Sequence, residues 1–332
     1  MKIIDATTYG RDVWNAFVEQ NYPPIGAFMQ TWEWGEFQEM IGRKIGRYAV
    51  KDGGETIAMF TLVHYTWRFG FSYGYIPRGP VFLNDSADNA VAIFSAIKEW
   101  VRKAFPDFMF VRMEPPFSSF DLSVLNKDFS IPKYYIQPRF NTAVPLTLGD
   151  DVTLQFHSST RSNVTRAEKR GVSAKVVDVL TIDEYEQFMV MMQETAARNG
   201  AKNIYPNNDY LKSFIASFQI LGSKSDSTKP SLGIFFGYHH ERLAAINLVV
   251  FFAGTATYLY GASYTKNLNS KITTYLHTVG MQEAKKRGYL YYDIGAIDQK
   301  RWSTLTNFKR QFRGDEFEYI GNIDIPLKKF LY

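Results

Sequence analysis

The sequence predicts an α/β protein with mixed sheets, in which one kind of domain occurs twice. A β-meander, a helix and a further strand follow one another in the first half of the chain, and the same order returns in the second half. Equivalent points such as Tyr75 and Tyr260 lie about 185 residues apart, far more than the period of a solenoid repeat. The length of 332 residues also suits two domains of roughly 100–200 residues each.

In the first half, glycines and aromatic residues mark out the meander. Asp52-Gly53-Gly54 is a turn signal between two strand-like runs, and a third, aromatic run follows. A helical pattern and a short apolar strand that ends at Glu114 complete this half. The expected elements are strands at 47–51, 56–65, 71–76 and 108–113, and a helix at about 88–103.

The second half repeats this order. The expected elements are strands at 232–238, 243–252, 255–260 and 289–294, a turn at 239–242, and a helix at about 270–287 that stops at Gly288. A helix between strands after a β-meander fits acyl-transfer folds of the acetyltransferase (GNAT) type. We therefore expect two tandem GNAT-like domains, at 1–146 and 147–317. A terminal strand at 318–325 would return to the first domain, so that 318–332 completes it.

Composition excludes several kinds of chemistry. The chain has no cysteine, which excludes a thiol nucleophile, disulfides and thiolate metal sites. Its five histidines do not cluster at metal-ligand spacing, so we expect neither a metal nor a cofactor. The N-terminus lacks the apolar segment of a signal peptide, and no run of ~18 apolar residues occurs. We expect a cytoplasmic protein.

Basic residues form two clusters in a chain whose net charge is +5. A solvated helix face would explain each cluster by itself. Two clusters that frame one domain also favour a ligand that carries phosphate groups. The first cluster consists of Arg161, Arg166, Lys169, Arg170 and Lys175, and the second of Lys300, Arg301, Lys309, Arg310 and Arg313.

Near the C-terminus, Lys309 stands between the aromatic residues Phe308 and Phe312. A lysine in this setting can stabilise a developing negative charge, and the aromatic can stack on a base. The sequence has no Gly-x-Ser-x-Gly elbow. Neither 78–89 nor 261–271 carries the glycine-rich turn with which ordinary acetyltransferases bind pyrophosphate. Direct transfer between two bound substrates is then the main option, and a surface lysine on a C-terminal helix is the plain alternative.

Short motifs spread along nearly the whole chain form a series that is specific in its order and spacing. They are QTWEWG at 30–35, YIPRGPV at 75–81, QPRFN at 137–141, SNVTRAEKRGV at 162–172, YLYGAS at 258–263, YDIG at 292–295, FKRQF at 308–312 and EYIG at 318–321. In this series the chain resembles the FemA/FemB/FemX (FemABX) peptidoglycan-bridge aminoacyltransferases, and it is closer to their short members, which lack a helical arm.

The resemblance implies an aminoacyl-tRNA donor and an acceptor amine on the stem peptide of a peptidoglycan precursor. Lys309 matches the family lysine that stabilises the tetrahedral intermediate, and Phe308 matches the aromatic that contacts the terminal adenosine. Tyr260 and Tyr210 match tyrosines near the acceptor pocket, and Glu114 matches an acidic residue at the end of a first-domain strand. The first domain would serve the acceptor and the second the tRNA. The tRNA contacts that we expect are Arg161, Arg166, Lys169, Arg170 and Arg310.

Two departures from the family pattern concern the acceptor. Members that bind the soluble UDP-linked precursor use a lysine where Gln38 stands, and an arginine that 201–205 does not offer. Each missing charge-assisted contact is worth ~1.5–3 kcal/mol. The resemblance therefore favours a lipid-linked over a UDP-linked precursor, with Arg78 taking over part of the phosphate binding. The aromatic segment 65–71 could touch the inner face of the membrane, although packed strand aromatics are the commoner use. We expect a monomer.

Two other functions fit parts of the pattern. A CoA-dependent N-acyltransferase of the same fold would use acetyl-CoA, although the glycine turn for its pyrophosphate is missing. A non-catalytic tRNA-binding module would use the two basic clusters, and it would bind tRNA whether or not the 3′-end is aminoacylated.

Overall fold

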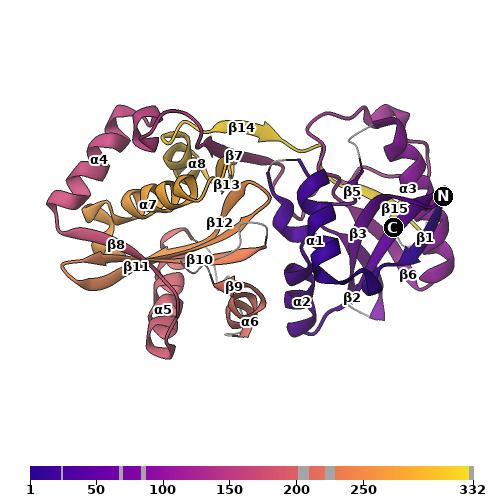
Figure 1. The fold of residues 1–332 in the computed structure, drawn as a ribbon, viewed down its shortest axis with the longest axis horizontal. Helices are drawn as coiled ribbons and strands as arrows, with labels where there is room; N and C mark the ends of the chain where they lie inside the picture. The colour runs from indigo at the N-terminus through magenta and orange to yellow at the C-terminus, as the bar shows by residue number, and fades with distance from the viewer. Residues whose placement is uncertain (24, 67–69, 84–86, 201–208, 221–228, 329–332) are drawn as a thin grey trace. The chain divides into compact units, whose positions relative to one another are not determined.

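The chain folds as two compact units (Figure 1). Unit 1 consists of residues 1–139 and 317–332, and unit 2 consists of residues 140–316. The structure, a computed structural model, describes residues 1–23, 25–66, 70–83, 87–200, 209–220 and 229–328. Each unit is built on one mixed sheet with helices packed against it.

The sheet of unit 1 has seven strands, in the order β1-β2-β3-β4-β6-β15, with β5 paired to β3. Strands β2, β3 and β4 form an antiparallel meander, whereas β4 and β6 run parallel because a helix connects them. Strand β15 comes from the end of the chain and pairs antiparallel with β6. The bounds are β1 Lys2–Asp5, β2 Lys44–Asp52, β3 Glu55–Thr66, β4 Ser72–Ile76, β5 Val81–Phe82, β6 Phe108–Met113 and β15 Ile323–Pro326.

The QTWEWG motif fixes the second helix of unit 1. Thr31 caps this helix, because its Oγ1 accepts a hydrogen bond from the backbone N–H of Trp34 at 3.1 Å. The fully buried Gln30 accepts from the backbone N–H of Thr61 at 3.0 Å and donates to the carbonyl of Pro77. The motif thus ties the helix to β3 and to the loop after β4. The helices are α1 Gly10–Asn21, α2 Trp32–Met40 and α3 Ala87–Ala104.

The sheet of unit 2 has eight strands, in the order β14-β7-β13-β12-β11-β10-β8, with β9 paired to β10. It repeats the plan of unit 1, because an antiparallel meander is followed by a helix and then by β13, which runs parallel to β12. The bounds are β7 Phe140–Pro145, β8 Val172–Val177, β9 Gln219–Ile220, β10 Ser231–His239, β11 Arg242–Phe252, β12 Thr255–Ser263, β13 Tyr291–Ala296 and β14 Asp315–Glu318.

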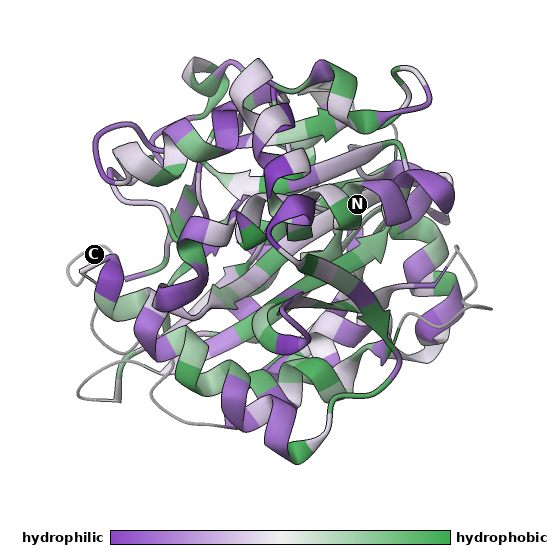
Figure 2. Cartoon of the chain, turned by 90° about the vertical axis from the view of Figure 1, so that its left-hand side faces the viewer, coloured by the Kyte–Doolittle hydropathy of each residue, from purple (hydrophilic) through white to green (hydrophobic). Residues whose placement is uncertain are grey.

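The helices of unit 2 cover both faces of its sheet. Figure 1 shows α4, α7 and α8 on one face and α5 and α6 on the other. In Figure 2, hydrophilic and hydrophobic residues alternate along the helices, as expected where each helix buries one face. Thr181 and Glu184 form a capping box at the start of α5. The bounds are α4 Ser158–Lys169, α5 Ile182–Arg198, α6 Asp209–Ser217, α7 Ile272–Lys286 and α8 Ser303–Arg310.

The predicted fold class is confirmed, since both halves show a meander, a helix and a parallel strand on a mixed sheet. The second unit spans residues 140–316, so it begins seven residues before the expected 147 and ends one residue before the expected 317. Strand β7 pairs with β13, so residues 140–145 lie in unit 2. The expected strand at 318–325 is in fact two strands, because β14 ends at Glu318 and β15 begins at Ile323.

The return of β15 to unit 1 rests on a buried ion pair. Arg112 on β6 donates through Nε and Nη2 to the two carboxylate oxygens of Asp324 at 2.8 and 2.7 Å, and Asp324 is fully buried. We expect Asp324→Ala to lower the free energy of unfolding by about 3–5 kcal/mol, because Arg112 would remain buried without its counter-charge. Urea denaturation measures this loss.

The control for this experiment is Arg102→Ala. Arg102 pairs with Glu99 at 3.3 Å on the exposed side of α3, and a pair of that kind contributes about 0–1 kcal/mol. Equal losses in the two variants would show that the Arg112–Asp324 pair does not hold β15.

Candidate active site

The segment from β13 to α8 carries the predicted catalytic lysine. The pairing of β13 with β7 shifts register between Asp293 and Gly295. Gly295 has φ +91°, a backbone conformation that residues with a Cβ seldom adopt. A Cβ at this position would lie 3.3 Å from Nζ of Lys309. The glycine that ends the YDIG motif therefore makes room for the ammonium group.

Lys309 lies in the last turn of α8, and only 6% of it is exposed. Its Nζ donates to the carbonyl oxygen of Ala296 at 2.7 Å, at the end of β13. Within the described part of the chain this is its one hydrogen bond, so two N–H bonds of the ammonium group remain for a ligand. The alternative of a surface lysine is wrong, since the helix directs Lys309 into unit 2.

Burial lowers the pKa of Lys309 to about 8, and the nearby Asp293 opposes this effect. Asp293 is itself held in place, because its Oδ1 accepts a hydrogen bond from the backbone N–H of Gly295 at 2.8 Å. Lys309 is therefore mostly protonated at pH 7. A cation that has already lost its water shell interacts strongly with negative charge that develops beside it.

Aromatic rings pack beside the lysine. Phe308 is half-buried and meets Phe312 edge to face, with ring centroids 5.4 Å apart. The ring of His277 on α7 lies 5.9 Å from Phe308 and 5.7 Å from Phe312. These contacts fix the Phe308 ring on its inner side, and its remaining exposed surface is of the kind on which a base can stack.

His277 is a buried neutral group in this cluster. Burial and the charge of Lys309 lower its pKa to about 3. Its Nδ1 lies 3.3 Å from the hydroxyl of Tyr292, and its ring lies 4.5 Å from that of Tyr258. A neutral imidazole packs against Lys309 without repelling the ammonium charge, so His277 supports the position of the lysine.

A bulge in β12 sends two neighbouring tyrosines to opposite faces of the sheet. The register of β12 against β11 shifts between Tyr258 and Tyr260. Tyr258 contacts His277 on α7, whereas Tyr260 meets Phe214 on α6 edge to face at 5.2 Å. Tyr210 precedes Phe214 by one helical turn, so it lies on the same face of α6. The structure thus groups Tyr260 with the α6 residues, and Lys309 with Tyr258 and His277.

Glu114 and Arg78 lie together in unit 1. The carboxylate of Glu114, directly after β6, accepts hydrogen bonds from the hydroxyl of Tyr75 at 2.6 Å and from the backbone N–H of Gln137 at 3.0 Å. Arg78 has φ +48° and is buried. Its guanidinium lies 3.7 Å from the ring centroid of Tyr319 and donates to the carbonyl of Pro138 at 2.6 Å. The fold thus holds both groups in fixed positions.

Gln38 is almost fully buried near the end of α2. Its Oε1 accepts a hydrogen bond from Nη1 of Arg43 at 2.5 Å. A neutral side chain therefore stands where the resembling proteins carry a lysine, and a guanidinium group lies against it.

The five predicted tRNA contacts differ in their surroundings. Arg161, Arg166, Lys169 and Arg170 are exposed on or directly after α4, so they form one basic face on this helix. Arg310 is exposed on α8, but it is paired with Glu316 at 2.6 Å. The second basic cluster is thus divided, because Lys309 is buried and Arg310 already has a counter-charge.

No sequence pattern predicts a role for His277, Tyr258 or Asp293. Tyr258 and Asp293 stand inside the YLYGAS and YDIG motifs, and YLYGAS also contains Tyr260, a predicted substrate contact. His277 could have been placed on the buried face of its helix from its spacing to Met281 and Ala284. No short sequence pattern predicts the bulge in β12 that places Tyr258 and Tyr260 on opposite faces of the sheet.

Comparison with known proteins identifies the family. The sequence model of the FemAB family matches residues 11–124, 119–221 and 235–332. The chain belongs to the FemAB family. This membership makes it an acyltransferase of the peptidoglycan-bridge type. No curated protein sequence matches the chain.

Solved structures share the fold of this FemAB protein. The crystal structure of FemX superposes with a TM-score of 0.77 over 100% of this chain and 99% of that one, at 19% sequence identity. L-PGS from Bacillus licheniformis gives a TM-score of 0.56 at 12% identity, covering 96% and 92% of the two chains. A tandem GNAT protein from the clavulanic acid biosynthesis pathway gives 0.52 at 10% identity, covering 95% and 88%. The predicted tandem GNAT-like fold and the predicted family are thereby confirmed.

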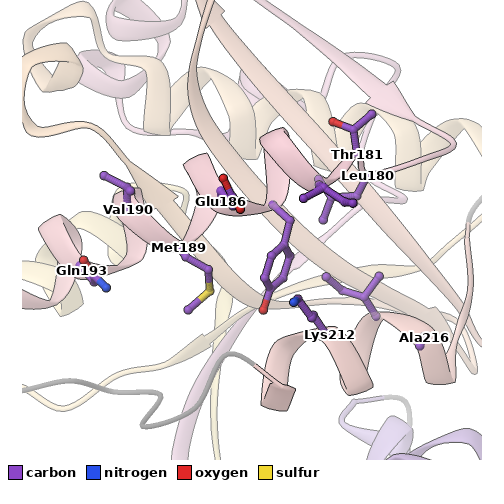
Figure 3. A pocket seen from close by; sticks show the side chains of 11 residues that line it. Leu180, Thr181, Glu186, Met189, Val190, Gln193, Lys212 and Ala216 are labelled. Carbon is purple, nitrogen blue, oxygen red and sulfur yellow. The ribbon is translucent and has the colours of Figure 1, made fainter.

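The FemAB chain also has an apolar pocket of about 610 Å³ between α5 and α6 (Figure 3). Met189 and Val190 line it from α5, and Lys212 reaches into it from α6. Nζ of Lys212 lies 5.3 Å from the ring centroid of Tyr185. None of the predicted catalytic or substrate-binding residues lines this pocket.

Two predictions fall on residues that the structure leaves out. Positions 201–205, which lack the family arginine, and positions 67–69 of the aromatic segment lie outside the described residues. In the rest of that segment, Tyr65 stacks on Tyr73 with ring centroids 5.1 Å apart, and Phe71 is 37% exposed. No helix in the described ranges is long and apolar enough to cross a membrane.

The burial of Lys309 predicts an unusual dependence of stability on pH. Between the folded pKa of about 8 and the value of 10.5 for an ordinary lysine, the unfolded chain binds more protons than the folded one, so stability rises with pH. The shift corresponds to roughly 3 kcal/mol. We expect Lys309→Met to unfold at higher urea concentration than the wild type at pH 7, and the difference to shrink as the pH is raised above 8.

Lys300→Met is the matched control, because Lys300 is an exposed lysine of the same unit. It should change stability little, and equally at every pH. A Lys309→Met curve that stays parallel to the wild-type curve from pH 7 to pH 10 would contradict the buried-cation interpretation.

Proposed function

We propose that this FemAB protein transfers an amino acid from aminoacyl-tRNA to the stem-peptide amine of a peptidoglycan precursor. One observation carries the proposal: a desolvated ammonium group, Lys309, is fixed at the end of β13 with two N–H bonds available for an oxyanion. A half-buried aromatic ring, Phe308, stands next to it in the chain. An acyl ester on a nucleotide needs two interactions from a protein: stabilisation of the developing oxyanion, which Lys309 can provide, and stacking of the base, which Phe308 can provide.

The chemistry needs no covalent intermediate with the protein. The acceptor amine attacks the ester carbonyl carbon, and the carbonyl oxygen becomes negatively charged in the tetrahedral intermediate. The C–N bond then remains and the C–O bond to the tRNA ribose breaks, while the leaving oxygen takes up the proton that the amine releases. Lys309 would donate to the oxyanion, and positioning of the two substrates would supply most of the remaining rate enhancement.

The donor would lie along unit 2. Stacking of the terminal adenine on Phe308 would place the ester near Lys309. The basic face of α4 would contact the tRNA phosphates through Arg161, Arg166, Lys169 and Arg170. Arg310, which is already paired with Glu316, would contribute less than these four residues.

Each unit by itself carries some of the expected acceptor contacts. The fixed carboxylate of Glu114 suits the amine or an amide of a stem peptide, and Tyr260 and Tyr210 offer hydroxyl groups near α6. The neutral Gln38 favours a lipid-linked over a UDP-linked precursor, and such a precursor would be met at the inner face of the membrane. Arg78 contributes less to phosphate binding than its charge suggests, because it is buried and the nearby carboxylate of Glu114 already offsets part of its charge.

The decisive experiment incubates the protein with a mixed pool of aminoacyl-tRNAs and with lipid-linked or UDP-linked precursor, and reads the product masses. We expect the precursor to gain one or more amino acid residues, more readily in the lipid-linked form. No mass gain with either precursor would refute the proposal. A gain with acetyl-CoA in place of aminoacyl-tRNA would favour the CoA-dependent alternative. Binding of tRNA without transfer, equal for charged and uncharged 3′-ends, would favour the RNA-binding module.

Lys309→Met should lower the rate of transfer by about 10²–10³, the usual loss when one oxyanion donor is removed. The wild-type rate should also fall above about pH 8, as Lys309 loses its proton. Lys300→Met should retain the wild-type rate. Full activity of a folded Lys309→Met protein would remove Lys309 from the mechanism.

A further inference from the structure

Unit 1 has a pocket of about 680 Å³ at the end where α2 stops and β2 begins. The end of β3, the start of β4 and the loop between α3 and β6 complete its wall. Glu114, by contrast, follows the C-terminal end of β6, so the pocket lies at the opposite end of the parallel pair β4–β6. Its lining includes Arg43, Lys44, His64, Tyr65, Ser72 and Asp107.

Arg43 is held in a defined position in this pocket. Its guanidinium donates to Oε1 of Gln38 at 2.5 Å and lies 4.5 Å from the ring centroid of Tyr65. Tyr65 in turn stacks on Tyr73. Both partners of Arg43 are neutral, so the positive charge is oriented but not compensated. Because the guanidinium is already held in one orientation, the side chain loses little conformational entropy when it binds an oxyanion.

The charge balance of the pocket is positive. Lys44 is exposed next to Arg43, and neither residue forms an ion pair within the described ranges. The carboxylate of Asp107 is the opposing charge in the lining. Lys328 adds a further cation beside it, because its Nζ donates to the backbone carbonyl of Asp107 at 3.3 Å. Arg11, Arg102, Arg112 and Arg139 of unit 1 are paired with carboxylates. Arg47 and Arg78 are buried and have neutral hydrogen-bond partners as Arg43 does, but they do not line this pocket.

Two exposed apolar residues stand within two positions in the chain of residues that line the basic pocket. Met40 at the end of α2 is 53% exposed, and Phe71 directly before β4 is 37% exposed. A cationic hollow with exposed apolar residues close by in the chain matches the boundary of a bilayer, where phosphate groups lie directly above acyl chains. A free phosphate would use the cations but would gain nothing from Met40 and Phe71.

We propose that this pocket binds the phosphate of an anionic phospholipid headgroup and so holds unit 1 against a membrane surface. Arg43 and Lys44 contact the phosphate, and Met40 and Phe71 enter the region of the acyl chains. The proposal does not depend on the transfer reaction. Its test is a binding measurement, so its outcome is independent of whether aminoacyl transfer is found.

The test is co-sedimentation of the full chain with vesicles of phosphatidylcholine alone or mixed with phosphatidylglycerol. We expect binding only to the mixed vesicles, and weaker binding as salt is added. The double variant Arg43→Gln/Lys44→Gln should bind about 10- to 30-fold more weakly, because each basic residue near an anionic surface contributes roughly a factor of five. Met40→Ser/Phe71→Ser should also weaken binding.

The matched control is Lys127→Gln/Lys133→Gln, which removes two charges from exposed lysines of unit 1 that do not line the pocket. It should bind as the wild type does. Because Arg43 also supports Gln38 and Tyr65, Lys44→Glu serves as a second variant, and thermal unfolding checks that each protein is folded.

Three results would overturn the proposal. They are wild-type binding by a folded Arg43→Gln/Lys44→Gln protein, equal weakening by the control pair, and absence of binding to the mixed vesicles. Inorganic phosphate is the competing probe. Saturable binding of phosphate without any binding to vesicles would assign the pocket to a soluble phosphate compound instead of a lipid.

Discussion

The candidate active site depends on keeping one ammonium group out of water. An isolated buried cation is costly, and the structure offsets the cost with the Ala296 carbonyl, the nearby Asp293 and a histidine that stays neutral. The irregular end of β13 places Asp293 and the Ala296 carbonyl, and its Gly295 admits the lysine, whereas the histidine comes from α7. An ordinary residue at Gly295 would both strain the backbone and crowd Nζ. The register shift between Asp293 and Gly295 is therefore what allows Lys309 to be buried at the candidate active site.

The two units share one order of strands and helix, but the ends of their parallel strand pairs differ. In unit 1 the parallel pair β4–β6 shifts register near its start, between Ser72 and Gly74, and is then regular as far as Ile76 and Met113. The N–H of Glu114 still bonds to the carbonyl of Ile76 at 3.1 Å. In unit 2 the parallel pairing of β12 with β13 extends to Thr257 and Asp293, and the irregular positions of both strands follow. At the end of the parallel pair in unit 1, the carboxylate of Glu114 is buried. At the corresponding end in unit 2, the ammonium group of Lys309 is buried instead. Duplication of the fold thus supplied two different binding environments.

The sequence predicted the order of the elements because each has a local signal. The Asp52-Gly53-Gly54 turn, the periodicity of α7 and the stop at Gly288 are of this kind. It predicted Lys309 and Phe308 because their motif is compact. It did not predict the position of β7, a six-residue strand whose place depends on pairing with β13, almost 150 residues further along the chain. The bulge in β12, the role of His277 and the uncompensated charge of Arg43 also depend on contacts between distant segments, which no short pattern encodes.

The position of β15 has a consequence for how the protein is made. Residues 140–316 are continuous, so unit 2 is complete as soon as they have left the ribosome. The sheet of unit 1 instead waits for residues 323–326, which are synthesised after the whole of 140–316. Until then β6 is an edge strand, and its apolar residues Met109, Val111 and Met113 flank an open row of backbone hydrogen-bonding groups. The sheet of unit 1 is thus begun before unit 2 and completed after it, and the nascent protein is most exposed to aggregation while unit 2 is being synthesised.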